Sequence, residues 1–287
     1  MQAARPRTLG VGVAPVLVGT ALGASDAGCV RWGRGVLAFV VALTIQVGVN
    51  YANDYSDGVR GTDAQRKGPV RLTASGLASS SAVRAAAGIA FAVAAVAGLA
   101  LCVVVEPLLL LFGLAALGAA VLYTGGPRPY GYEGLGELFV FLFFGIVAVA
   151  GSFFVQVKEL DWEAFALAVP VGLLAAAILL VNNVRDIDSD RRAGKRTLAV
   201  RLGRERTRTL YAATIYAAYV LAPVTWLFGP TAAWVILPWL TLPVAAPIVR
   251  AVRNRADGTS LNQALAQTGM LQLAFCMLLS AGLLLSR

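Results

Sequence analysis

Two similar strings of asparagine and aspartate stand out in an otherwise apolar sequence, NYANDYSD at 50–57 and NNVRDIDSD at 182–190. Within each string, three oxygen-bearing side chains recur at helical spacing and share one face of a helix. They are Asn50, Asp54 and Asp57 in the first string and Asn182, Asp186 and Asp190 in the second. Carboxylates at the edge of a membrane span are costly unless a metal, a counter-charge or water accepts them, so these strings predict a functional site.

The side chains in the two strings suit a hard metal ion that prefers oxygen ligands. The chain has no histidine, and its three cysteines stand alone without metal or redox spacing, so zinc and histidine-based nucleophiles are not expected. Magnesium commonly binds through a few carboxylates together with water and substrate phosphates. Nearby Arg and Lys side chains would neutralise the remaining phosphate charge. The pattern therefore predicts a magnesium-dependent clamp for a diphosphate.

Each polar residue near the strings has an expected role in this clamp. The expected metal ligands are Asp54, Asp57, Asp186 and Asp190, with Asp63 as a fifth carboxylate. The expected diphosphate-binding residues are Asn50, Arg60, Lys67, Arg71, Asn182 and Lys195. The alternative for any single Asp at a membrane edge is a solvated helix end or an ion pair with a nearby Arg. For Asp188, which is off the face shared by Asp186 and Asp190, that alternative is favoured.

The composition identifies the elements that must position these residues. With 58% hydrophobic residues, 14% charged residues and a mean hydropathy of +0.74, the 287-residue chain is too apolar for a soluble domain of this size. At about 20 residues per bilayer crossing, it predicts an all-α, polytopic membrane protein with about nine transmembrane helices in one domain, residues 1–287. The expected spans are 9–24, 35–52, 85–105, 107–125, 138–157, 164–184, 209–228, 230–249 and 264–286.

The distribution of basic residues predicts the orientation of these helices. If the N-terminus is inside, 20 of the 24 Lys and Arg residues fall on the cytoplasmic side. Both Asp strings then lie at the cytoplasmic face of the cell membrane, and the C-terminus lies outside. The net charge of +9 is accounted for by this topology, so no nucleic-acid partner is expected. Because the first apolar stretch leads into further spans, we do not expect a cleaved signal peptide.

The two strings also resemble each other in position. Asn50 and Asn182, like Asp54 and Asp186, are offset by 132 residues. Since four expected spans separate the two strings, the simplest organisation is two parallel four-helix halves plus a ninth helix, with the strings facing one central cavity. Chance similarity within an apolar sequence is the alternative. Three polar loops, at 57–77, 123–137 and 188–208, are expected to cover the mouth of this cavity.

A diphosphate at the mouth of a membrane cavity suggests a substrate whose other end is a long hydrocarbon. In an allylic prenyl diphosphate, metal binding makes the diphosphate a good leaving group, and aromatic faces shield the carbocation that develops. The segment FVFLFFG, with Phe139, Phe141, Phe143 and Phe144, could line such a tunnel. The alternative is that these rings only pack helices or face lipid.

At this point the motifs resemble a known family. The paired strings NDYSD at 53–57 and DIDSD at 186–190 are similar to those of the UbiA superfamily of intramembrane prenyltransferases. The segments YTGGP and GKRTLA are similar to those of its 1,4-dihydroxy-2-naphthoate branch. The resemblance implies a helical bundle in which a polyprenyl diphosphate alkylates the naphthoate ring with loss of carbon dioxide. It implies magnesium and diphosphate ligands at Asn50, Asp54, Asp57, Asp186 and Asp190. From their loop position we also expect Tyr123 and Arg128 on the acceptor side.

Several alternatives remain open from the sequence. A related prenyltransferase acting on 4-hydroxybenzoate, homogentisate, haem or chlorophyllide would use the same clamp. A phosphatidyl-transferring enzyme would also use Asp residues and magnesium, but its usual D-G-x-x-A-R start is absent, because Asp57-Gly58 is followed by Val59-Arg60-Gly61. A cation-coupled transporter could place Asp pairs on two repeat halves. Transporters usually keep such carboxylates near the bilayer midplane, whereas here they are expected at helix ends beside Arg and Lys.

Overall fold

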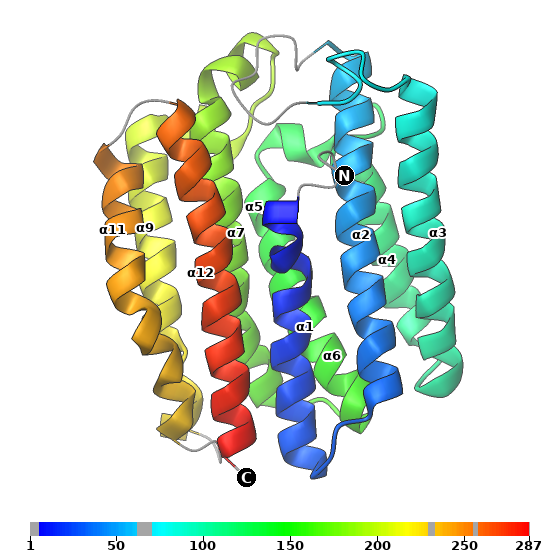
Figure 1. Ribbon diagram of the computed structural model, residues 1–287, viewed down its shortest axis with the longest axis vertical. Coiled ribbons are helices and arrows are strands. Elements are labelled where there is room, and N and C mark those ends of the chain that lie inside the picture. The colour runs from blue at the N-terminus through cyan, green and yellow to red at the C-terminus, as the bar shows by residue number, and fades with distance from the viewer. Residues whose placement is uncertain (1–5, 62–70, 229–232, 255–257, 287) are drawn as a thin grey trace.

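The computed structural model describes residues 6–61, 71–228, 233–254 and 258–286, and these form an all-helical bundle (Figure 1). The long helices in chain order are α1 (Pro6–Ala27), α2 (Trp32–Val59), α3 (Ser80–Val104), α4 (Leu109–Leu122), α7 (Trp162–Arg192), α9 (Arg204–Leu221), α11 (Leu242–Asn254) and α12 (Gly258–Leu285). The shorter elements are η2 (Tyr130–Glu133), α5 (Gly136–Phe141), η3 (Leu142–Val147), α6 (Ala148–Val157), α8 (Leu198–Leu202), α10 (Val224–Phe228) and η4 (Ala233–Thr241).

Eight helical segments of the described chain are long and apolar enough to cross a membrane. They include α5, η3 and α6 as one continuous span over Gly136–Val157, and η4 with α11 as another over Ala233–Asn254. The chain is therefore an all-helical, multi-pass membrane protein. The predicted span 107–125 corresponds to α4, which has 14 residues and measures about 21 Å, less than the roughly 30 Å of a hydrocarbon core. The count of nine crossings stays a prediction.

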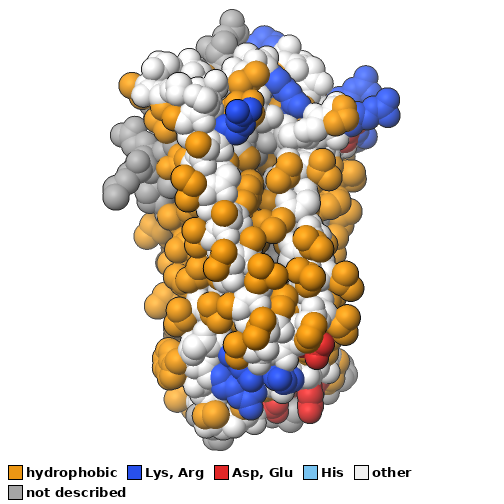
Figure 2. All heavy atoms as spheres, turned by 90° about the vertical axis from the view of Figure 1, so that its right-hand side faces the viewer, with side chains coloured by type: hydrophobic (Ala, Val, Ile, Leu, Met, Phe, Trp, Pro, Cys, Tyr) orange, Lys and Arg blue, Asp and Glu red, His pale blue; other side chains and the backbone are white. Residues whose placement is uncertain are grey.

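The surface follows the pattern expected of a membrane protein. Figure 2 shows hydrophobic side chains over the middle of the face that it presents, while the charged side chains gather toward its two ends. Helices α3 and α4 carry exposed apolar residues of this kind, for example Val96, Val103, Leu111 and Leu114. Such a wide apolar belt is stable in lipid but would be an aggregation site in water.

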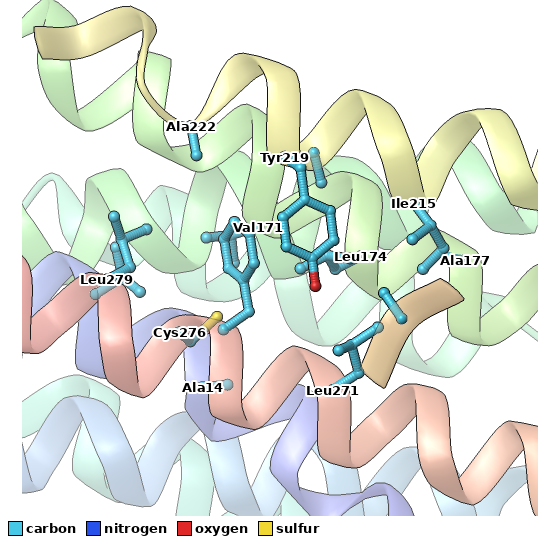
Figure 3. Close-up of a cluster of buried hydrophobic side chains, with 14 of the residues drawn as sticks. Ala14, Val171, Leu174, Ala177, Ile215, Tyr219, Ala222, Leu271, Cys276 and Leu279 are labelled. Carbon is cyan, nitrogen blue, oxygen red and sulfur yellow. The ribbon is translucent and has the colours of Figure 1, made fainter. Parts of the chain in front are cut away.

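Helix α7 is the centre of the bundle. Its residues Val171, Leu174 and Ala177 pack in the core shown in Figure 3 together with Tyr219 of α9 and Leu279 of α12. Hydroxyl groups pair within this core, and those of Tyr219 and Thr241 lie 2.6 Å apart. In a membrane such internal partners matter because lipid offers none.

A close glycine contact joins α7 to the span made by α5, η3 and α6. Gly145 lies in η3, a π-helical turn, and faces Gly172 of α7. A Cβ added at Gly145 would lie 2.6 Å from the Gly172 Cα, closer than side chains ever approach. Only glycine on both sides permits this approach, which is the small-residue packing that brings membrane helices together. The contact fixes the span from which Phe139 and Phe143 point into the bundle.

The C-terminal ends of α2 and α7, which carry the two Asp strings, lie at the same end of the bundle (Figure 1). The loops after α4 and α7 lie at this end as well, with the described residues between α2 and α3, and the chain ends at the opposite one. The fold thus gathers the polar strings and loops in one place. Which side of the membrane this end faces stays a prediction, as does the internal repeat.

Candidate active site

A cavity of about 640 Å³ opens between the ends of α2 and α7. Of the residues predicted from the sequence, it is lined by Asn50, Asp57, Arg71, Tyr123, Asn182, Asp186, Asp190 and Lys195. The two Asp strings, 125 or more residues apart in the chain, therefore meet at one cavity. Its deeper walls are apolar, so a charged head group and a hydrocarbon tail could be held in a single site.

Asp57 lies at the centre of a network of charged side chains at the cavity mouth. Its Oδ1 accepts a hydrogen bond from Lys195 Nζ at 2.9 Å, and its Oδ2 lies 3.4 Å from Arg71 Nη2. The Tyr132 hydroxyl also donates to Oδ1. The side chains of the Asp57–Lys195 pair are only 6% and 10% exposed, so the pair is weakly screened by water. One carboxylate thus holds two cations at the cavity wall.

Lys195 reaches Asp57 because the chain turns sharply after α7. Gly194 adopts a positive φ of 73°, which glycine accepts without strain, and the Lys195 N–H donates to the Asp190 carbonyl at 2.9 Å. The next residue, Arg196, donates its N–H to the Tyr132 carbonyl at 2.7 Å. Lys195 Nζ lies 4.5 Å from the centre of the Tyr132 ring, a cation–π contact. The segment GKRT therefore joins α7 to the loop that carries Tyr132.

Asp54 has a different place from the one expected. Its two oxygens accept hydrogen bonds from the backbone N–H groups of Leu72 and Thr73, both at 2.9 Å. It is 1% exposed and is not among the residues that line the cavity. In this structure Asp54 holds the loop that presents Arg71, and a role as metal ligand stays a prediction.

Asp186 is held by a residue that the sequence analysis did not single out. Arg185 donates to both Asp186 oxygens, from Nε at 2.8 Å and from Nη2 at 2.7 Å. The same guanidinium donates to the side-chain oxygens of Asn182 and of Asn262 on α12, both at 2.8 Å. Since the Arg185 side chain is only 1% exposed, it orients two cavity residues and links α7 to α12.

Aromatic rings cover the wall beside the polar mouth. Tyr123 meets Tyr130 edge to face at 5.5 Å between ring centres, and Tyr130 stacks on Phe139 at 4.1 Å. The phenol of Tyr123 is a neutral hydrogen-bond donor at this wall. Of the predicted tunnel rings, Phe139, Phe143 and Phe144 line the cavity, whereas Phe141 packs on Gly172.

Three other polar residues lie away from the cavity. Arg60 donates to the backbone carbonyls of Thr124 and Gly126, both at 2.7 Å, and so holds the loop after α4. Arg128 is exposed and does not line the cavity. Asp188 forms an exposed ion pair with Arg204 at 2.8 Å, in agreement with the alternative favoured for it. Asp63 and Lys67 lie outside the described residues.

Comparison with known proteins gives the family of the chain. Residues 12–284 match the UbiA prenyltransferase family. The chain belongs to this family. It is 45% identical over 280 residues to the 1,4-dihydroxy-2-naphthoate octaprenyltransferase of Mycobacterium tuberculosis, covering 98% of this chain and 94% of the relative. The Escherichia coli enzyme of the same name is 35% identical over 301 residues, covering 100% and 95%.

Solved structures of UbiA homologues share the fold. One from Archaeoglobus fulgidus, bound to DMAPP and Mg²⁺, superposes with a TM-score of 0.66 at 18% identity and covers 100% of this chain and 99% of its own. An apo structure from Aeropyrum pernix K1 gives a TM-score of 0.68 at 17% identity, covering 96% and 97%. The family match confirms the predicted superfamily, and the shared fold confirms the all-helical class.

The oxygen donors around the cavity of this UbiA protein fit magnesium. Asp57, Asp186 and Asp190 supply carboxylates, while Asn50 and Asn182 supply amide oxygens, and no sulfur or imidazole ligand is present among them. Within the described ranges, no three acidic or sulfur-bearing residues lie close enough to enclose a metal by themselves. This arrangement suits an ion that takes its remaining ligands from water and substrate phosphates.

Sequence reasoning missed five residues of this UbiA site: Asn53, Tyr132, Glu137, Asn183 and Arg185. Asn53 accepts from the Thr124 hydroxyl at 2.7 Å, and Asn183 donates to Glu137 at 2.9 Å. A signal was present for Arg185, because an arginine in an apolar helix, three residues after Asn182, needs an internal partner. Glu137, a carboxylate at the start of an apolar span, offered the same signal, whereas Tyr132 gave none, since its place depends on how the loop after α4 folds onto α7.

Proposed function

We propose that this protein transfers a polyprenyl group from an allylic polyprenyl diphosphate to 1,4-dihydroxy-2-naphthoate. The prenyl C1 forms a bond to the ring, the C1–oxygen bond breaks to release diphosphate, and the carboxyl group leaves as carbon dioxide, which gives demethylmenaquinol. One observation carries the proposal: two carboxylate strings and two buried cations line the mouth of a cavity whose deeper walls are apolar. The names of the bacterial relatives support the acceptor.

In this proposal the residues at the mouth bind the diphosphate. Asp57, Asp186 and Asp190 would hold magnesium, with Asn50 and Asn182 contacting the metal, its water or a phosphate oxygen. When bound, magnesium would neutralise negative charge on the leaving diphosphate. Lys195 and Arg71, which pair with Asp57, lie where they can bind the diphosphate charge that the metal leaves.

The aromatic wall serves the reacting carbon and the acceptor. The rings of Tyr130, Phe139 and Phe143 stack in succession and line the cavity, so they can face the developing carbocation and exclude water from it. Tyr123 would donate a hydrogen bond to the acceptor. Because departing carbon dioxide returns its electron pair to the ring, the exchange of carboxyl for prenyl releases no proton from the ring, and no side chain has to act as its base.

The position of the carboxylates supports an enzyme rather than a transporter. Asp57 lies two residues before the end of α2, and Asp190 lies two residues before the end of α7, away from the bilayer midplane. From the distribution of the basic residues, we propose that this end faces the cytoplasm in the cell membrane.

The acceptor can be tested by competition. The purified protein in detergent would receive octaprenyl diphosphate, magnesium and an equimolar mixture of 1,4-dihydroxy-2-naphthoate, 4-hydroxybenzoate and homogentisate, with products identified by mass spectrometry. We expect one dominant product, the decarboxylated prenyl-naphthalenediol. A dominant product from another aromatic acid would keep the clamp and overturn the acceptor. If no acceptor is prenylated while a known relative is active in parallel, the proposed function fails.

A further inference from the structure

The cavity continues from the polar mouth to the opposite end of the bundle. Its lining includes Asp190 near the end of α7 and Phe165 near the start of the same helix. These residues are 25 positions apart, which corresponds to about 38 Å along a helix, more than the roughly 30 Å of a hydrocarbon core. The cavity therefore has the depth to hold an extended hydrocarbon chain across the whole membrane.

The far half of this cavity has open space beside its glycines. Gly98 of α3, Gly113 of α4 and Gly151 of α6 all line it, and a Cβ added at any of them would meet no heavy atom within 4 Å. Gly98 and Gly151 lie six residues before the ends of their helices, and Gly113 lies four residues after the start of α4. These ends lie opposite to the polar mouth (Figure 1).

Other glycines of the bundle serve helix packing instead. At Gly145 and Gly172 an added Cβ would lie within 3.0 Å of the facing helix. Packing therefore does not explain Gly98, Gly113 and Gly151, which leave room that a larger side chain would fill. The surrounding wall is mainly apolar, with Leu101, Phe112 and Phe154, as expected for a site that holds hydrocarbon, and its polar members at this end are Glu106 and Ser152.

We infer that Gly98, Gly113 and Gly151 set the longest prenyl chain that the protein accepts. The inference rests on the proposed function and specifies which part of the donor this region holds. A long chain passes the glycines on its way to the far end, while a short chain ends before it reaches them. A bulky side chain at these positions shortens the channel without touching the residues at the mouth.

The structure offers matched controls for this inference. Gly88 of α3 and Gly118 of α4 also have no heavy atom within 4 Å of an added Cβ, yet neither lines the cavity. Gly113 and Gly118 are five residues apart, which places them about 140° apart around α4. Leucine is a better helix former than glycine, so Gly→Leu at each position is compatible with the helix.

The test compares Gly98→Leu and Gly113→Leu with the controls Gly88→Leu and Gly118→Leu. Each variant would be assayed with geranyl diphosphate and with octaprenyl diphosphate, using the same acceptor and magnesium. We expect the two cavity variants to lower kcat/KM for the octaprenyl donor by about tenfold or more, with the geranyl donor within about twofold of the wild type. The controls should keep the wild-type ratio of the two donors.

A measurement of donor binding without turnover distinguishes a failure of this inference from a failure of the proposed function. The shift in thermal stability caused by each diphosphate with magnesium needs no turnover, and we expect the cavity variants to lose the larger part of the octaprenyl shift only. An unchanged donor ratio and unchanged shifts in both cavity variants would overturn the inference, as would an equal loss in the controls. Wild-type protein that shows the shifts but prenylates no acceptor would refute the proposed function. The role of the three glycines would then be decided by comparing the thermal shifts of the cavity variants with those of the controls.

Discussion

Replacing Lys195 by methionine tests whether the buried ion pair at the cavity mouth serves both the fold and the donor. The substitution keeps the length of the side chain and removes its charge. Asp57 then loses its partner at 2.9 Å but keeps Arg71 at 3.4 Å and the Tyr132 hydroxyl. Breaking a buried pair costs about 3–5 kcal/mol when the remaining charge has no partner, and a single charge-assisted hydrogen bond is worth about 1.5–3 kcal/mol.

Because two partners of Asp57 remain, we place the expected loss of unfolding free energy for Lys195→Met at about 2–3 kcal/mol. Each kcal/mol lowers Tm by roughly 2–4 °C in a soluble protein of 150–250 residues, so a decrease of roughly 4–12 °C in detergent is expected. If Lys195 also binds the diphosphate through a charge-assisted hydrogen bond of about 1.5–3 kcal/mol, kcat/KM for the donor should fall by roughly 10- to 150-fold.

The double variant Asp57→Asn/Lys195→Met separates the two roles. The double variant leaves no Asp57 charge deprived of Lys195, but Arg71 loses its ion pair at 3.4 Å, so Tm should recover part of the way toward the wild type, while turnover should stay lost. Arg201→Met is the control, because the Arg201–Glu133 pair at 3.2 Å is half exposed and such pairs contribute at most about 1 kcal/mol. A stable double variant with wild-type turnover would refute the reasoning, because the pair would then be structural only.

Three further outcomes follow from contacts in the structure. Asp54→Asn should lower both Tm and turnover, because it weakens the two backbone hydrogen bonds that hold the loop with Arg71; unchanged turnover by a variant with lowered Tm would contradict this link. Arg185→Met should destabilise the protein by about 3–5 kcal/mol in chemical unfolding, because Asp186 loses both charged hydrogen bonds, and a loss below about 1 kcal/mol would contradict it. Gly145→Leu should prevent folding, as judged by aggregation in size-exclusion chromatography, because α7 leaves no room for a side chain, and a monodisperse, heat-stable variant would disprove that contact.

Much of the fold follows from the sequence alone, because lipid imposes simple rules. Long apolar runs predict spanning helices, and the described chain forms them where expected, apart from the short α4. The strings NYANDYSD and NNVRDIDSD could be recognised because residues that share one face of a helix are close in the sequence. Their polar side chains are also costly in an apolar chain. For the same reason the sequence predicted the meeting of Asp57, Asp186 and Asp190 at one cavity.

The individual partners within the site could not be predicted from the sequence. Asp54 and Asp57 are three residues apart, yet the first binds backbone N–H groups of a loop and the second binds side-chain cations. Arg60 looked as suitable for phosphate as Lys195, but it holds the loop after α4. These differences depend on how loops fold over the helix ends, where Gly and Pro turns rather than periodic patterns decide the path of the chain.

The dependence of product formation on magnesium and on both Asp strings tests the central claim most directly. Wild-type protein, Asp57→Asn and Asp190→Asn would be assayed by mass spectrometry with octaprenyl diphosphate and 1,4-dihydroxy-2-naphthoate, with magnesium or with a chelator. We expect product from the wild type only with magnesium, and a loss of at least about 100-fold in either folded variant. Product formation that persists in the chelator, or near-normal turnover by both variants, would contradict a single metal-dependent site built from the two strings.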